Sequence, residues 1–333
     1  MDRKIARIER ALAQLSGHET CCTLCPRECR VNRKEGEAGI CRSGVRASFS
    51  HALIHHGEEP VLSGSHAAAP PGSPKSQVAP PPRGSGTIFF TGCNLKCLFC
   101  QNYQLSWLTQ GRAVSDEELA AIMLDLEKKG AYNINLVSPT HLIIPILRAL
   151  NLAYRQGLRI PIVYNSNGYE KVDIIEKLTG IIDIYLPDLK YFSPDVAAKF
   201  SGAPDYFSHA HLSIQEMFCQ QPALVLDDRE IARKGLIIRH LLLPGQTADS
   251  LAVLDWLARH LPRSVPLSLM SQYHPCYRAP TEIQRPLSAE EYQAVLTRAN
   301  ELQFERLFIQ PEGFEPDEHL VPDFSRPDPF KWR

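Results

Sequence analysis

The sequence predicts an α/β fold: a partial (β/α)6 TIM-like barrel with a small cysteine-rich, metal-binding segment at its N-terminus. Strand-like and helix-like segments alternate from Gly86 onward, a pattern typical of a parallel sheet with right-handed crossovers. Three closely spaced cysteines directly follow the first of these strands. Active sites of such barrels lie at the C-terminal ends of the strands, so these cysteines fall on the expected active face.

The individual elements follow from local patterns. Strands are predicted where apolar and β-branched residues gather, at 87–91, 133–138, 160–165, 181–187, 236–243, 265–270 and 306–310. Helices are predicted at 1–19, 115–130, 142–156, 247–260 and from 288 onward. Two of these helices begin with a capping box, formed by Ser115 with Glu118 and by Ser288 with Glu291. The chain therefore divides into a segment 1–63, a Pro/Gly-rich linker or loop 64–86, and a barrel domain 87–333.

Composition excludes several classes of protein. The 333 residues carry 36 basic and 37 acidic side chains, for a formal net charge of -1, so we expect neither a nucleic-acid surface nor a membrane surface. No run approaches the roughly 20 apolar residues of a membrane span. The ten cysteines favour metal ligands over disulfides in a chain without a signal peptide, and we expect a cytoplasmic protein.

The strongest motif is the run Cys93, Cys97 and Cys100, with the spacing C-x3-C-x2-C. Electron-transfer iron–sulfur clusters commonly use four cysteines. Three thiolates on one tight loop leave the fourth iron of a [4Fe-4S] cubane without a protein ligand, and therefore open to a substrate or cofactor. A zinc knuckle is the alternative, but such sites usually pair two C-x2-C units, and no nearby fourth ligand follows Cys100.

This loop resembles that of the radical S-adenosylmethionine (SAM) superfamily. From about residue 86 to 310 the chain is similar to the pyruvate formate-lyase activating enzymes, more specifically to an activating-enzyme-like branch. The resemblance rests on CLFCQN, the N-G-Y after the third strand, D-L-K after the fourth, R-H-L-L-L-P-G in the fifth and Q-Y-H after the sixth. It implies a [4Fe-4S] cluster that chelates SAM, and reductive cleavage of SAM to a radical that abstracts hydrogen from a substrate.

The resemblance also implies roles for residues at the strand ends. Phe99 would pack near the adenine, and Arg239 would face SAM or the substrate. Ser138 and Thr140 would replace the family's Gly-Gly-Glu, which this chain lacks. The SAM ribose, its carboxylate or an adjacent cation would be lined by Asn165, Asp188, Lys190 and His274. Asn165 stands where the activating enzymes commonly have Asp, which puts their cation site in doubt.

A second cysteine set lies in the N-terminal segment. Read as C-x2-C-x3-C-x11-C, its ligands are Cys22, Cys25, Cys29 and Cys41. Four thiolates suit a structural zinc ion or a closed iron–sulfur cluster. We slightly favour a structural metal, because a segment this small cannot build a core of its own.

Three functions fit these patterns. The first is a radical SAM activase whose partner is a glycyl-radical enzyme, reduced by a flavodoxin- or ferredoxin-type electron donor. The second keeps the radical chemistry but modifies a small molecule, a peptide or another protein side chain. The third is a non-catalytic zinc or iron–sulfur scaffold, which the polar clusters at five successive strand ends do not favour.

Overall fold

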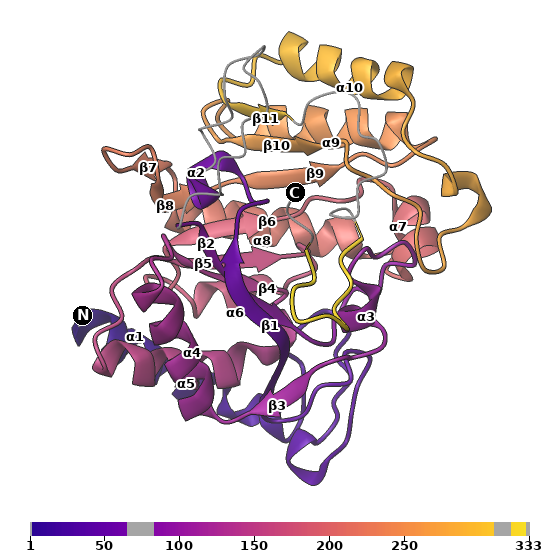
Figure 1. Ribbon diagram of the computed structural model, residues 1–333. Coiled ribbons are helices and arrows are strands. Elements are labelled where there is room, and N and C mark those ends of the chain that lie inside the picture. The colour runs from indigo at the N-terminus through magenta and orange to yellow at the C-terminus, as the bar shows by residue number, and fades with distance from the viewer. Residues whose placement is uncertain (1, 65–82, 310–320, 331–333) are drawn as a thin grey trace.

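The computed structural model describes residues 2–64, 83–309 and 321–330. Its centre is a curved sheet of parallel strands (Figure 1), which in spatial order are β2 (Ser85–Phe90), β4 (Ile134–Val137), β5 (Ile162–Ser166), β6 (Ile184–Pro187), β9 (Ile238–Leu241), β10 (Leu267–Met270) and β11 (Leu307–Ile309). A bridge between Asp188 and Arg239 joins β6 to β9. This arrangement confirms the predicted partial barrel.

One predicted strand and one predicted boundary differ in detail. The segment predicted as one strand at 236–243 forms two, because β8 (Ala232–Leu236) pairs with the first part of β6 and then leads through Ile237 into β9. The linker predicted at 64–86 ends inside β2, and its residues 65–82 lie outside the described part of the chain.

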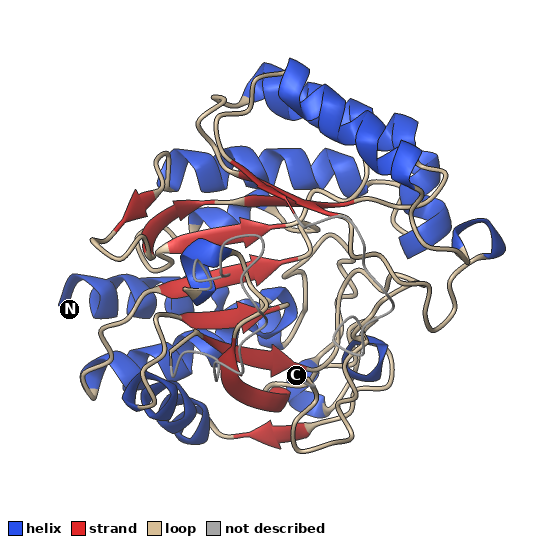
Figure 2. Ribbon diagram, turned by 45° about the horizontal axis from the view of Figure 1, so that its top comes forward, coloured by secondary structure: helices blue, strands red, loops and turns tan. Residues whose placement is uncertain are grey.

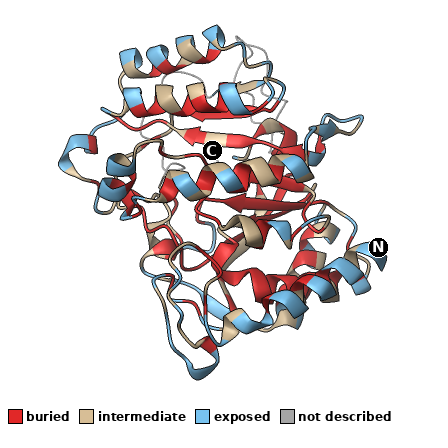
Figure 3. Cartoon of the chain, turned by 180° about the vertical axis from the view of Figure 1, so that it is seen from behind, coloured by how far each residue is buried: buried red, intermediate tan, exposed pale blue. Residues whose placement is uncertain are grey.

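The longer helices cover the outer face of the sheet, as Figure 2 shows. In chain order the helices of the described residues are α1 (Asp2–Leu15), α2 (Pro60–Ser63), α3 (Tyr103–Ser106), α4 (Asp116–Lys128), α5 (Ile143–Arg155), α6 (Val172–Glu176), α7 (Pro194–Ser201), α8 (Tyr206–Gln220), α9 (Thr247–His260) and α10 (Ala289–Glu301). Both predicted capping boxes are present, at Ser115 and at Ser288. The strands and the inner sides of the helices are buried, whereas the outer sides of the helices are exposed (Figure 3).

One edge of the sheet is antiparallel, which the sequence analysis did not predict. β1 (Ala47–His55) pairs antiparallel with β2, and β3 (Arg112–Val114) pairs antiparallel with β1. At the other side of the sheet β7 (Val225–Leu226) pairs antiparallel with β8. β1 gave little signal because serine and histidine interrupt its apolar residues. The N-terminal segment therefore contributes a strand to the sheet.

The two faces of the sheet bury different sets of residues, since side chains alternate along a strand. Tyr164 and Tyr185 belong to the large core shared with the helices. Their neighbours on the opposite face belong to a separate apolar cluster that lies inside the barrel, made of Val61, Leu62, Val163, Ile184, Leu186, Ala232 and Ile237. The short helix α2 therefore fills part of the barrel interior.

The last described segment, 321–330, packs on the same inner face. Phe324 and Phe330 contact Phe89 of β2, with ring centroids 5.3 and 5.4 Å from it. The ring centroid of His55 lies 4.5 Å from that of Phe330.

None of the helices in the described ranges has both the length and the apolar composition that a membrane span requires.

Candidate active site at the strand ends

The cysteine loop leaves β2 through a glycine that the fold requires. Gly92 has a φ of 79°, in the left-handed region, and a Cβ atom there would lie 2.4 Å from the carbonyl oxygen of Cys41. A larger residue would therefore both strain the backbone and collide with the N-terminal segment. His141 also supports the turn, because its Nε2 lies 2.9 Å from the carbonyl oxygen of Thr91.

Polar groups are directed at the three sulfur atoms of the loop. The Sγ of Cys93 accepts from the amide of Leu95 and from the Nδ2 of Asn167, both at 3.4 Å. Ser201 donates its hydroxyl to the Sγ of Cys97 at 3.1 Å. In the same way, Ser106 donates to the Sγ of Cys100 at 3.2 Å. Hydrogen bonds to sulfur are one of the means by which proteins tune iron–sulfur clusters.

The arrangement of these thiols is one that a cubane can use. All three line one cavity, yet no three His, Cys, Asp or Glu side chains within the described residues form a site for one ion. In a cubane each thiolate binds a different iron, so the sulfur atoms need only face the same cavity. Burial raises the pKa of Cys97 and raises that of Cys100 to about 12, so a cluster bound at these sulfur atoms would have to displace their protons.

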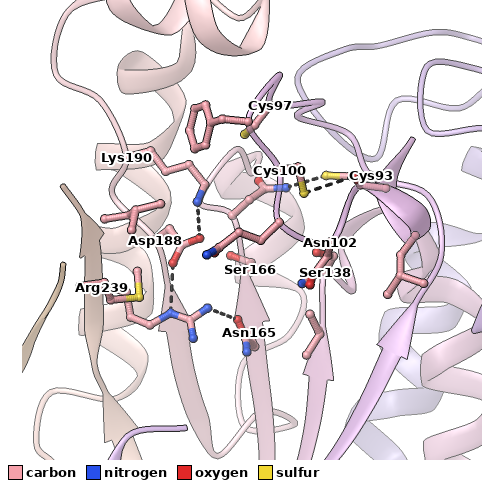
Figure 4. Close-up of a pocket in the computed structure, with 18 of the residues that line it drawn as sticks. Cys93, Cys97, Cys100, Asn102, Ser138, Asn165, Ser166, Asp188, Lys190 and Arg239 are labelled. Carbon is pink, nitrogen blue, oxygen red and sulfur yellow. Dashed lines mark hydrogen bonds and ion pairs between the residues drawn. The ribbon is translucent and has the colours of Figure 1, made fainter. Parts of the chain in front are cut away.

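Opposite the cysteine loop, charged side chains from neighbouring strands form a connected network (Figure 4). The Oδ1 of Asp188 accepts from the Nε of Arg239 at 3.0 Å, and its Oδ2 accepts from the Nζ of Lys190 at 2.7 Å. The Nη2 of Arg239 donates to the Oδ1 of Asn165 at 2.6 Å. Burial opposes ionisation of Asp188, but the two cations outweigh it and lower the pKa of this carboxyl.

The structure brings most of the predicted site residues together. The walls of the cavity include the three loop cysteines together with Phe99, Ser138, Asn165, Asp188, Lys190 and Arg239. The Phe99 ring is held by Tyr273, 5.8 Å away. Two predicted residues, Thr140 and His274, do not line this cavity.

Thr140 does not line the cavity, and its hydroxyl has another partner. It is fully buried and donates to the Oε1 of Glu170 at 2.5 Å. The hydroxyl of Tyr164 donates to the Oε2 of Glu170 at 3.3 Å. Burial raises the pKa of Glu170 to about 7. This buried carboxyl fixes the positions of the loops that follow β4 and β5.

Sequence reasoning missed two residues of the site. Asn167, which contacts Cys93, is the first residue of the N-G-Y motif noted above, and its alternation with Asn165 could have indicated it. Glu58 follows β1 inside the barrel, where its Oε2 lies 3.4 Å from the Nη1 of Arg239. Nothing in the sequence marks Glu58, because its approach to Arg239 depends on the antiparallel pairing of β1 with β2.

The second cysteine set lies directly against the first. The guanidinium of Arg27, between Cys25 and Cys29, donates to four carbonyl oxygens at 2.6 to 3.0 Å, those of Asn94, Leu95, Ser201 and Gly202. Burial, together with the neighbouring thiols of Cys41, Cys22 and Cys29, raises the pKa of Cys25 to about 12. The backbone turns back on itself within this set, because the amide of Arg30, next to Cys29, donates to the carbonyl oxygen of Cys22 at 2.8 Å. The four cysteines of this set too form no single-ion site within the described residues.

Comparison with known proteins agrees with this geometry. The model of the radical SAM superfamily matches residues 87–213. An uncharacterized protein of Methanocaldococcus jannaschii, MJ0674, is 30% identical over 300 residues, which cover 86% of this chain and 76% of that protein.

Two solved structures are similar at low sequence identity. SuiB of Streptococcus suis, bound to S-adenosylmethionine, is 17% identical with a TM-score of 0.46, over 66% of this chain and 48% of that one. The methylornithine synthase PylB is 15% identical with a TM-score of 0.43, over 65% and 60% of the two chains. The chain thus spans about half to three fifths of these two proteins.

Proposed function

The chain belongs to the radical SAM superfamily, and we propose that it generates a 5′-deoxyadenosyl radical in order to activate a glycyl-radical enzyme. As a member of this superfamily it is an enzyme that uses a [4Fe-4S] cluster and SAM. When bound, the cluster supplies the electron that cleaves SAM. The protein's own residues bind, orient and shield the reactants.

The observation that carries the proposal is the cavity shared by the cysteine loop and the charged strand ends. Cys93, Cys97 and Cys100 would ligate the cluster, because they are the thiols that face this cavity and their sulfur atoms already accept hydrogen bonds. Lys190 and Arg239 would hold the SAM carboxylate. Both cations are oriented by Asp188, so the protein positions its charges before the ligand arrives.

The finer assignment, activation of a partner protein, draws support from the open side of the barrel. Among the described strands, the antiparallel edge formed by β3 and β1 does not pair with the opposite edge, β11. A backbone loop of a partner could therefore approach the cavity between these edges. The sequence resemblance to the activating enzymes points to a glycine residue as the target.

One observation favours a second candidate, a small substrate or a peptide. Phe324 and Phe330 cover part of the inner face beside Phe89, so the described C-terminal segment narrows the space within the barrel. A compact substrate would need no displacement of this segment, whereas a protein loop would have to pass it.

Electron paramagnetic resonance separates the two candidates. Anaerobically reconstituted, dithionite-reduced protein is mixed with SAM and a candidate glycyl-radical enzyme from the same organism. The expected result is consumption of SAM to 5′-deoxyadenosine and a glycyl radical doublet in the partner. SAM cleavage without such a signal in any partner would favour the second candidate, and absence of cleavage would overturn both.

A further inference from the structure

We propose that an acidic one-electron carrier protein, of the flavodoxin or ferredoxin class, docks on an aromatic and basic surface beside the cysteine loop. This inference rests on the proposed function, because each SAM cleaved consumes one electron and the side chains around the cavity are not reductants. The surface, here called the Trp107 patch, consists of Ile40, Arg42, Trp107, Leu108, Tyr277 and Arg278.

The patch contacts the loop that carries the predicted cluster ligands. The indole Nε1 of Trp107 donates to the carbonyl oxygen of Cys97 at 2.9 Å. The residue before it, Ser106, donates to the Sγ of Cys100. A single hydrogen bond therefore links the Trp107 ring to the backbone of the cysteine loop, and a carrier seated on the ring would be close to the cluster. Figure 1 shows α3, which ends at Ser106, beside the indigo N-terminal segment.

The charge of the patch is positive. The guanidinium of Arg278 lies 5.7 Å from the Trp107 ring centroid and 5.1 Å from that of Tyr277. Arg42 donates to the carbonyl oxygen of Trp107 at 3.2 Å, and the Nζ of Lys96 lies 5.2 Å from the same ring. Within the described part of the chain neither Arg42 nor Arg278 forms an ion pair with a carboxylate, so both charges are available to an acidic partner.

The patch also has the composition of a protein interface. Ile40 is 44% and Leu108 is 48% exposed, and both are among the few large apolar side chains exposed in the described residues. The Tyr277 ring stacks on Tyr103 at 4.9 Å with an interplanar angle of 12°, which holds it in place. Aromatic residues and arginine are enriched in interfaces, and small transient interfaces are typical of redox partners.

Complementary charge favours a protein carrier over a neutral reductant. Positive charges around an apolar centre speed the approach of an acidic partner and make binding weaken with salt. The test uses the double variant Arg42→Glu, Arg278→Glu, whose side chains are exposed and belong to no part of the cavity. A matched control, Arg3→Glu, Arg10→Glu, makes the same change of net charge on exposed positions of α1.

The first measurement is binding, by anaerobic calorimetry of the cluster-loaded protein with oxidised flavodoxin and, separately, with a [2Fe-2S] ferredoxin. We expect at least one carrier to bind the unmodified protein and the control with equal affinity, about 10-fold or more tighter than it binds the double variant. Raising the salt concentration should reduce the difference in affinity between the unmodified protein and the double variant. Equal affinity for all three proteins, or no binding of either carrier, would overturn the proposal.

The second measurement separates this proposal from the proposed function. Dithionite reduces the cluster without docking, so the double variant should cleave SAM at the unmodified rate with dithionite and about 10-fold more slowly with the reduced carrier. Loss of dithionite-driven cleavage in the unmodified protein would refute the proposed function. Equal carrier-driven rates in the variant and the control would refute only the docking surface.

Discussion

The two cysteine sets differ in what surrounds them, although they lie against each other. The sulfur atoms of Cys93, Cys97 and Cys100 receive hydrogen bonds from a backbone amide, an asparagine and two serines, and they face a cavity. In the N-terminal set the Sγ of Cys41 is met at 3.6 Å by the guanidinium of Arg33, and none of its four cysteines lines that cavity. This difference in surroundings fits the proposed roles, a ligand set open to a cofactor for the first and a closed structural metal site for the second.

The largest expected effect is on the cavity set. Replacing Cys97 by Ala should abolish SAM cleavage, with a loss well beyond the ~10–100-fold caused by removing an outer hydrogen-bond partner of a metal ligand. The measurement is 5′-deoxyadenosine formed per molecule of anaerobic, dithionite-reduced protein. Cys21→Ala, at an exposed thiol, is the control and should cleave normally. Cleavage by the Cys97 variant at the unmodified rate would make the assignment of the two sets wrong.

The next effect is on stability. The double variant Cys22→Ala, Cys25→Ala should lose the metal of the N-terminal set and at least ~3 kcal/mol of unfolding free energy, because structural metals contribute directly to folding. Metal analysis identifies the group: loss of zinc alone supports a structural ion, and loss of additional iron and sulfide supports a cluster. Cys219→Ala, at an exposed thiol, should change neither quantity. Unchanged metal content in the double variant would remove the basis for calling this set a metal site.

A pH titration of stability tests the buried carboxyl of Glu170, which contacts Thr140 and Tyr164. The pKa of Glu170 is about 7 in the folded protein and near its ordinary value of 4.5 when unfolded. Between these values the folded state holds a proton that the unfolded state has released, so stability falls as pH rises. The free energy of unfolding should be lower by up to about 3 kcal/mol above pH 7 than at pH values below 4.5.

Chemical denaturation from pH 5 to 8 measures this slope. Gln at position 170 cannot titrate, so in Glu170→Gln the free energy of unfolding should fall much less between pH 5 and 8. Asp228→Asn, at an exposed site, should show the same fall as the unmodified protein. An identical slope in the Gln variant would show that Glu170 is ionised throughout and that another group holds the loops below the cavity.

The smallest effect concerns the contact between the two sets. Arg27→Lys keeps the charge but cannot reproduce the planar guanidinium that donates to four carbonyl oxygens. This substitution should lower the free energy of unfolding by about 1–2 kcal/mol. Iron content after reconstitution should fall as well, because two of those carbonyls lie within the cysteine loop. Arg30→Lys, at an exposed position of the same segment, is the matched control. Equal stability and iron content in the two variants would mean that the sets are independent.

Sequence reasoning predicted the parallel strands and the convergence of Asn165, Asp188, Lys190 and Arg239, because residues that follow parallel strands meet at one edge of the sheet. It did not predict β1, whose apolar residues are interrupted by Ser50 and His51. Without β1, the entry of Glu58 into the barrel could not be foreseen. It also placed Thr140 at the cavity, since adjacency in sequence cannot show that the hydroxyl turns toward Glu170.

The pairing of β1 with β2 has a consequence for anyone who would trim this protein to its recognisable part. The superfamily match begins at residue 87, yet the outer backbone of β2 is paired along Phe49 to His55. Removing everything before that match would leave β2 as an unpaired, apolar edge strand next to the cysteine loop. Exposed edge strands of this kind pair with other chains and promote aggregation. We therefore expect the smallest unit that folds on its own to include β1 and so to begin before the start of the superfamily match.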